Sequence, residues 1–125
     1  MPIQTARSVA TTRWRGPLGA ITFSPDGEPA PAISVFVSDI ERFIATTRPF
    51  GVLTWWPPVL REQLLGRVLG RVLAHEIGHY VLRSPAHSAD GLMRPLQLAD
   101  DLVGPSRRRF ALTAGEVARL QQRVR

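Results

Sequence analysis

The sequence predicts an α+β fold in which a small mixed sheet of three or four strands is backed by one long helix. Segments with the alternation of strands are concentrated in residues 1–57, an apolar helical pattern covers residues 58–82, and a capped helical pattern closes the chain at residues 113–125. Strands first and helices last is the order typical of α+β domains. The 125 residues, with 44% hydrophobic content, are enough for one domain with its own core.

A β-hairpin is expected near the start of the chain. Residues 18–23 and 33–37 are rich in alternating β-branched and aromatic side chains. Between them, residues 24–29 read Ser-Pro-Asp-Gly-Glu-Pro, which has the proline and the Asp-Gly pair of a tight turn. The two segments are therefore predicted to pair as neighbouring strands.

Two further segments are candidate strands of the same sheet. Residues 1–17 alternate loosely and suit a strand or an arm, and residues 51–56 are apolar until two prolines stop any ladder. Ser38 and Glu41 have the spacing of a capping box. Either a short helix follows the second hairpin strand, or that strand continues past Asp39.

One long helix is predicted over residues 58–82. Proline is tolerated in the first helical turn, and apolar side chains recur along the whole segment, which implies burial on most sides. Small residues recur at every fourth position, although each interior glycine costs about 1 kcal/mol relative to alanine. We expect this stripe to let the sheet approach the helix backbone; the alternative is a break into two shorter helices. The stripe consists of Gly66, Gly70, Ala74 and Gly78.

All three histidines of the chain lie in one stretch near the end of this helix. His75 and His79 are four residues apart, so they project from one helix face and can bind one metal ion. Glu76 lies between them, where a carboxylate can take a proton from water bound to the metal. His87 can add a third nitrogen, because the chain lacks cysteine and a metal must use nitrogen or oxygen ligands. The alternative is a structural histidine pair beside a surface carboxylate.

The stretch from His75 to Met93 resembles the active-site segment of the metzincin zinc peptidases, particularly the matrixin-like branch. That family carries the pattern H-E-x-x-H-x-x-G-x-x-H followed by a methionine turn. The resemblance implies that His75, His79 and His87 bind one catalytic zinc ion. It also implies that Glu76 is the catalytic general base and that Met93 forms the hydrophobic floor under the metal.

More widely, residues 60–120 look like the C-terminal half of small bacterial metzincin-like proteins. After the helix the chain departs from the family pattern: Leu82 replaces the family glycine, and two additional residues separate His79 from His87. A longer turn through residues 83–86, replacing a tight left-handed one, would account for both departures. Only 57 residues precede the helix, so we expect a minimal, or a truncated, metzincin-like domain. This single domain over 1–125 divides into strands and loops (1–57), the active-site helix (58–82), the zinc and methionine-turn loop (83–112) and the C-terminal helix (113–125).

Five further residues are candidates for lining a substrate cleft. Three lie on the first hairpin strand, where the resemblance implies that a sheet edge pairs with the backbone of a peptide. Arg71 precedes the first histidine by one turn and could bind a substrate carboxylate, although a solvated helix face is the simpler interpretation. Tyr80 follows a ligand and could donate to an oxyanion, or it could pack in the core. The strand residues are Gly19, Ala20 and Ile21.

The predicted function is that of a zinc-dependent endopeptidase acting on peptides or proteins. One rival is a zinc peptidase of the intracellular repressor-cleaving type, which also carries A-H-E-[IL]-G-H-Y but takes its third ligand from a downstream helix. Another is an inactive zinc-containing binding module whose arginine-rich surface contacts nucleic acid or an acidic protein.

The charge and hydropathy of the sequence limit the kinds of partner that the protein can have. The formal net charge is +6 and lysine is absent, so all 16 basic residues are arginine, which favours acidic partners through long-range steering. Few aromatic residues lie among the late arginines, so we do not expect a nucleic-acid partner. No apolar run approaches the roughly 18 residues of a membrane span, and the first twenty residues lack a signal-peptide run. The sequence leaves open both the oligomeric state and the choice between secretion and the cytoplasm.

Overall fold

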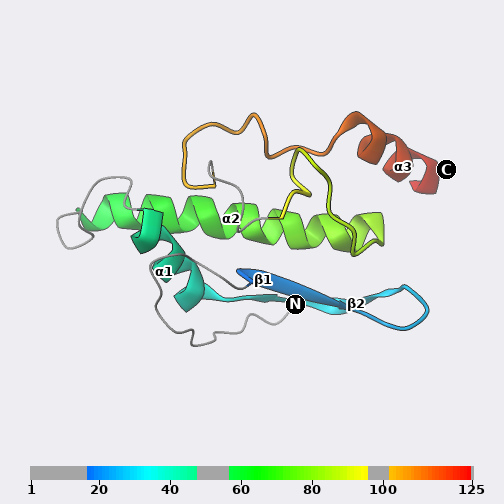
Figure 1. The fold of residues 1–125 in the computed structure, drawn as a ribbon, viewed down its shortest axis with the longest axis horizontal. Coiled ribbons are helices and arrows are strands. Elements are labelled where there is room, and N and C mark those ends of the chain that lie inside the picture. Colours follow the sequence, from blue (N-terminus) through cyan, green and yellow to red (C-terminus); the bar gives the residue numbers. More distant parts are fainter. Residues whose placement is uncertain (1–16, 48–56, 96–101, 125) are drawn as a thin grey trace.

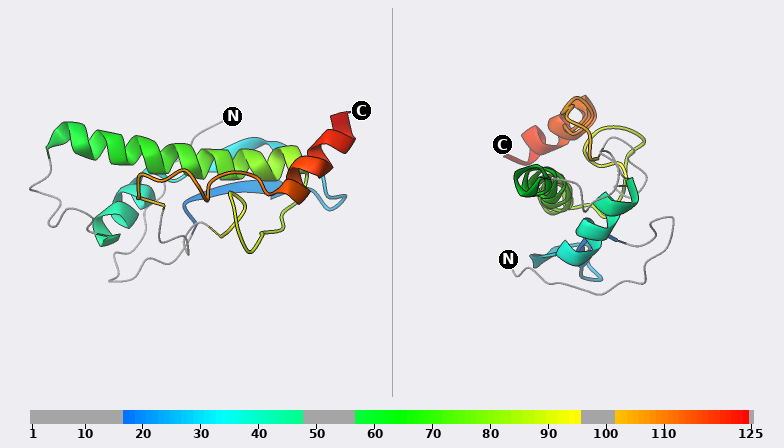
Figure 2. Two further views of the ribbon diagram at one scale, coloured as in Figure 1. Left: turned by 90° about the horizontal axis from the view of Figure 1, so that it is seen from above. Right: turned by 90° about the vertical axis from the view of Figure 1, so that its left-hand side faces the viewer.

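A computed structural model describes residues 17–47, 57–95 and 102–124 of the chain. Within these ranges, two strands are followed by three helices, which confirms the α+β class. The long helix α2 lies in the middle, with a β-hairpin and α1 on one side and the returning loop and α3 on the other (Figure 1 and Figure 2). The elements are β1 (Gly19–Phe23), β2 (Pro29–Val35), α1 (Val37–Thr47), α2 (Pro58–Leu82) and α3 (Ala114–Val124).

The strands β1 and β2 form the predicted hairpin. They pair antiparallel, with Gly19 opposite Val35. In the turn, the Gly27 N–H donates to the Ser24 carbonyl at 2.9 Å, and Gly27 has a positive φ of 87° that glycine adopts at little cost. The described sheet therefore has two antiparallel strands, and not the three or four of the predicted mixed sheet. The additional candidate strands, at residues 1–17 and 51–56, lie outside the described ranges apart from residue 17.

The second hairpin strand ends two residues earlier than predicted, because a helix begins there. The Ile40 N–H donates to the Phe36 carbonyl at 2.9 Å, so the first turn of α1 forms ahead of Ser38. Of the two alternatives after this strand, the short helix is confirmed. Its start at Val37 places Ser38 inside the first turn instead of at the cap.

The helix α2 has the predicted bounds and is continuous, so the alternative of two shorter helices is wrong. Despite its 25 residues, α2 is not apolar enough to cross a membrane, and neither is any other helix of the described chain. The residue after the helix, Arg83, is left-handed, with φ 51° and ψ 44°. The Ser84 N–H then donates to the His79 carbonyl at 3.2 Å, which is a Schellman-type ending. The tight left-handed turn is thus kept one residue beyond Leu82, and the expectation that a longer turn replaces it is corrected.

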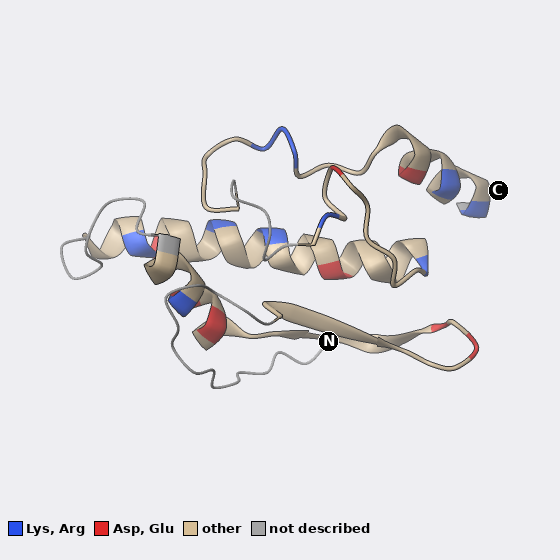
Figure 3. Cartoon of the chain, viewed as in Figure 1, with Lys and Arg blue, Asp and Glu red and all other residues tan. Residues whose placement is uncertain are grey.

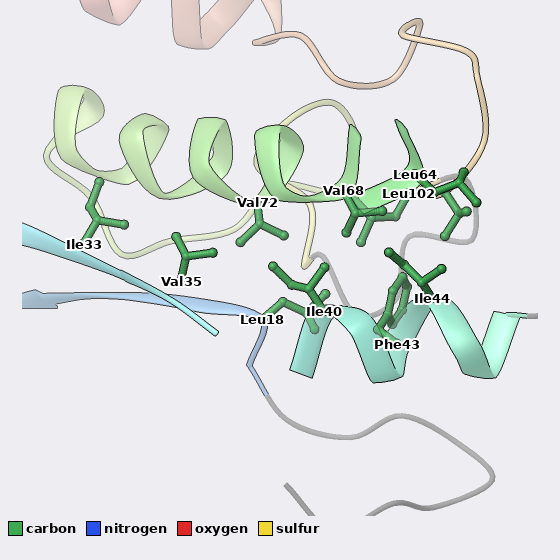
Figure 4. Close-up of a cluster of buried hydrophobic side chains, with 11 residues drawn as sticks. Leu18, Ile33, Val35, Ile40, Phe43, Ile44, Leu64, Val68, Val72 and Leu102 are labelled. Atoms are coloured by element: carbon green, nitrogen blue, oxygen red, sulfur yellow. The ribbon is translucent and has the colours of Figure 1, made fainter. Parts of the chain in front are cut away.

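The main core lies between α2, the hairpin and α1 (Figure 4). Leu64, Val68 and Val72 recur at every fourth residue and present one apolar face of α2 to the hairpin and α1. Gly19 at the start of β1 lies so close to this face that an added Cβ would sit 2.8 Å from Cγ1 of Val72. The buried cluster comprises Leu18, Ile33, Val35, Ile40, Phe43, Ile44, Leu64, Val68, Val72, Leu102 and Val103.

The glycine stripe of α2 does not face the sheet, contrary to the prediction. Gly66 and Gly70 are exposed, and a Cβ added to either would meet no atom within 4 Å. The sheet packs instead on the valine and leucine face, because larger apolar side chains there remove more surface from water. Gly78 does permit a close approach, but the group that reaches it is the side chain of Met93 from the loop after α2.

Two arginines bind the segment 102–110 to α2. Arg71 is 9% exposed and donates to the carbonyls of Leu102, Gly104 and Ser106 at 2.7–2.9 Å. Arg67 donates to the Val103 carbonyl at 2.8 Å. The segment, which itself carries a basic stretch, runs along one side of α2 (Figure 3). A solvated helix face, the simpler interpretation of Arg71, is therefore wrong.

Candidate metal centre

The structure brings the three predicted histidines together. The loop after α2 folds back along the helix (Figure 1). It brings His87 beside His75 and His79, which lie one turn apart on α2. The Nε2 atom of His75 lies 3.1 Å from that of His79 and 3.3 Å from that of His87. One nitrogen from each ring lies within 4.8 Å of the others. This cluster could hold a metal ion, as the spacing of the residues predicts.

Backbone carbonyls hold two of the three rings. Nδ1 of His75 lies 2.8 Å from the Leu92 carbonyl, and Nδ1 of His79 lies 2.8 Å from the Ser84 carbonyl. A carbonyl oxygen can only accept, so each Nδ1 carries the proton and each Nε2 presents a lone pair. Metal-binding histidines are commonly oriented in this way by a carbonyl on the second nitrogen.

The distances between the Nε2 atoms fit a metal better than they fit hydrogen bonds. With Nδ1 protonated in both helix histidines, two lone pairs face each other across 3.1 Å. That contact is repulsive unless a cation lies between the nitrogens. Tetrahedral zinc with Zn–N bonds of about 2.0–2.1 Å would separate its ligand nitrogens by about 3.3–3.4 Å. The residues present therefore fit a tetrahedral ion with nitrogen ligands.

Burial keeps the cluster in the form that binds metals. The pKa of His75 is lowered to about 4, mainly by burial; the hydrogen bond to Leu92 opposes this shift, and the charges of His79 and His87 contribute to it. The pKa of His87 is also lowered, first by burial and then by the charge of His79. Neutral imidazole is the metal-binding form, so His75 and His87 are ready for a cation at neutral pH.

Glu76 is a buried carboxyl next to His75 in the chain. It is 5% exposed, and burial raises its pKa to about 7. Its Cγ atom lies against Gly19 at the start of β1, where a Cβ would come within 3.2 Å. A carboxyl with a pKa near neutrality can both take and return a proton, as a general base that later acts as an acid must.

Met93 lies against the helix between the two helical histidines. It is 1% exposed, and its sulfur packs directly on the backbone of Gly78. The Met93 carbonyl accepts the Ser88 N–H at 2.9 Å, which ties this residue to the segment carrying the third histidine. This position agrees with a methionine turn, and the role of Met93 as a floor under the metal stays a prediction.

The contacts that support this loop were not visible in the sequence. The Ser88 hydroxyl donates to Glu116 at 2.7 Å, and the Leu92 N–H donates to the Ala111 carbonyl at 2.8 Å. Leu92 in turn holds the first histidine through its own carbonyl. The capped start predicted for the helix at residues 113–125 is confirmed: Thr113 and Glu116 form a capping box, in which each backbone N–H donates to the other residue's side chain. Its additional partner, Ser88, lies 28 residues away, and no local pattern signals such a contact.

The remaining cleft candidates are dispersed. The strand candidates lie on β1, where Gly19 faces Glu76 and Ala20 is exposed. Tyr80 is 36% exposed and, instead of packing in the core, lines a surface pocket beside Leu120 that contains none of the histidines. The guanidinium of Arg71 is committed to the carbonyls of the 102–106 segment and lies 4.1 Å from the Phe110 ring. Substrate contacts by these side chains stay predictions.

No family model, curated protein or solved structure matches this chain. Its function must therefore be argued from the chemistry of the site.

The pKa of His75 is lowered and the pKa of Glu76 is raised. These opposite shifts predict how the folding stability of the metal-free protein depends on pH. Below pH 6.5 the unfolded chain protonates His75 but the folded chain does not until about pH 4, so folding stability is lost as the pH falls through that window. Glu76 has the opposite sign, since the folded chain takes its proton near pH 7 and the unfolded chain near 4.5. We expect these two contributions largely to cancel in the wild type.

The Glu76→Gln variant removes the compensating carboxyl and should expose the histidine contribution. In chelator, its melting temperature should fall relative to that of the wild type as the pH drops from 7 to 4.5. Thermal unfolding monitored by circular dichroism across this range measures the difference. If the melting temperatures of the two proteins changed with pH in parallel, the opposite effects of burial on the pKa values of His75 and Glu76 would be contradicted.

Proposed function

We propose that the protein is a metzincin-like zinc endopeptidase that hydrolyses peptide bonds with Glu76 as its general base. The observation that carries the proposal is the convergence of three imidazole Nε2 atoms beside a buried carboxyl. His75, His79 and His87 would hold one zinc ion, and three neutral ligands leave a fourth position for a reactant. Bound zinc supplies Lewis acidity, which activates water and stabilises negative charge on a carbonyl oxygen.

The chemical work of the chain itself falls to Glu76. Its carboxylate accepts a proton from the attacking water and then delivers that proton to the leaving amine. Burial supports both steps, because a pKa of about 7 leaves the carboxylate basic enough to accept a proton and the carboxylic acid able to return it. The carbonyls of Leu92 and Ser84 keep the imidazoles of the helix oriented throughout.

The free edge of β1 is the proposed binding place for the substrate. Within the described ranges β1 pairs on one side with β2, and its other edge has no strand partner. An extended peptide could add to that edge through backbone hydrogen bonds. Gly19 lies at the end of β1 where Glu76 is buried, so this alignment would bring a peptide carbonyl toward the base. The proposed substrates are therefore extended segments of peptides or unfolded proteins.

One observation weighs against the repressor-cleaving type of peptidase. Among the described residues, the group that could hold a metal consists of three histidines, and Asp90 is exposed and pairs with Arg109 at 3.2 Å, so a downstream carboxylate as third ligand is not supported there.

For the nucleic-acid module, Arg71 and Arg94 contribute no outward charge, because their guanidinium groups lie 4.1 and 5.2 Å from the Phe110 ring and donate to loop carbonyls. Arg107, Arg108 and Arg109 are exposed, so salt-dependent DNA binding without peptide cleavage is the observation that would favour this rival.

Metal removal tests the proposed function. Purified protein is incubated with a mixture of unstructured peptides, and the products are identified by mass spectrometry. We expect cleavage that stops when zinc is removed with a chelator and returns when zinc is added. The His79→Ala variant, treated in the same way, should remain inactive after zinc addition. Failure of the zinc-loaded wild type to cleave any peptide, or cleavage that is indifferent to the chelator, would contradict the proposal.

A further inference from the structure

One carboxylate joins the loop of the third histidine to the first turn of α3. Glu116 is 6% exposed and accepts two hydrogen bonds, one on each oxygen. Its Oε1 receives the Thr113 N–H at 2.8 Å, and its Oε2 receives the Ser88 hydroxyl at 2.7 Å. Ser88 directly follows His87 in the chain. The cap of α3 and the residue that follows a candidate metal ligand therefore share a single acceptor.

His87 depends on its neighbour more than the other two histidines do. The rings of His75 and His79 are each fixed by a carbonyl on Nδ1. Within the described part of the chain, His87 makes no such bond, and it is exposed. Its placement rests on the backbone around Ser88, which is held by the Met93 carbonyl at one side and by Glu116 at the other.

We propose that Glu116 is a positioning residue for the metal centre, acting through Ser88 on His87, and that metal loading in turn stabilises the start of α3. The proposal rests on the proposed metal site but is independent of hydrolysis. Coupling between two sites is reciprocal, so the factor by which the Ser88–Glu116 contact strengthens metal binding equals the factor by which the metal strengthens that contact.

The expected loss of zinc affinity can be estimated from other metal sites, where groups that hydrogen-bond to the metal ligands have been removed. Removing a group that orients a metal ligand usually weakens metal binding by about 10–100-fold. The hydrogen bond from Ser88 has a charged acceptor and is partly shielded from water, which places it among the stronger hydrogen bonds of the molecule. We therefore expect zinc affinity to fall by about 10–100-fold when it is lost.

The experiment measures zinc affinity by competition with a chelating dye. Ser88→Ala and Glu116→Ala should each weaken binding by about 10–100-fold, and Ser88→Thr, which keeps the hydroxyl, should stay near the wild type. The decisive comparison is made in the His87→Ala background. There, Ser88→Ala should cause no further loss, because the contact acts only through the missing imidazole.

Thr113→Ala separates positioning from general stability. It removes the hydroxyl that accepts the Glu116 N–H at 3.3 Å but leaves the Ser88 contact in place. We expect its melting temperature to fall, as for other lost helix caps, with zinc affinity changed much less than in Ser88→Ala. The proposal would be overturned by equal affinity losses in Ser88→Ala with and without His87, by wild-type affinity in Ser88→Ala, or by loss in Thr113→Ala as large as in Ser88→Ala. Tight zinc binding without peptide cleavage would overturn the proposed function and leave this inference standing.

Discussion

Peptide hydrolysis is expected to fall by about 10²–10⁴-fold when Glu76 is replaced by glutamine, while zinc stays bound. Glutamine has nearly the size of glutamate, so it fits the buried position against Gly19. Its neutral amide cannot accept the proton of the attacking water. The histidines keep their carbonyl partners and hence their metal geometry.

The control for this variant lies on the same helix. Glu62 is exposed near the start of α2, so Glu62→Gln should leave both hydrolysis and zinc content unchanged. The comparison requires kcat/KM with a cleaved peptide and the zinc content of each purified protein. Unchanged hydrolysis in Glu76→Gln would remove Glu76 from the mechanism, and loss of zinc would show that the carboxylate belongs to the metal site.

Replacing His87 with alanine is expected to weaken zinc binding by more than the roughly 100-fold that outer contacts contribute, and to abolish hydrolysis. The reason is that the variant loses one of three nitrogen ligands, and a water molecule is a weaker ligand than imidazole. Isothermal titration or dye competition measures the affinity. This variant also separates the three-histidine centre from a site whose third ligand is a downstream carboxylate.

Asp90→Asn provides the matched control for that experiment. Asp90 lies in the same loop, is exposed and accepts the Gly91 N–H at 2.8 Å, which asparagine can also accept. We expect wild-type zinc affinity in this variant. If His87→Ala bound zinc as tightly as the wild type while Asp90→Asn bound it weakly, a carboxylate would be the third ligand.

The local features of the fold could be predicted because their causes are local. The bounds of α2 follow from a proline in the first turn and an apolar repeat up to Leu82. The capping box at Thr113 marks the start of α3 three residues ahead of its glutamate. The histidine cluster could also be predicted, because two of its members share a helix face and the chain holds a single further histidine.

Features that depend on distant partners could not be predicted in this way. The sequence shows that Gly66 and Gly70 are small, but it does not show which side of α2 the sheet covers. In the structure the sheet packs on a different face of the helix, the one that carries the valines. Arginine is usually a surface residue, so burial of Arg71 was not expected. Its three carbonyl partners come from a segment more than 30 residues later. The Ser88–Glu116 contact depends in the same way on the path of the chain between them.

The most direct test of the central claim is an anomalous scattering map of zinc-loaded crystals, collected at the zinc absorption edge. We predict one peak at the end of α2, with Nε2 atoms of His75, His79 and His87 at about 2.0–2.1 Å from it. A peak that His87 does not contact, or zinc-loaded crystals with no peak among the three histidines, would contradict the account.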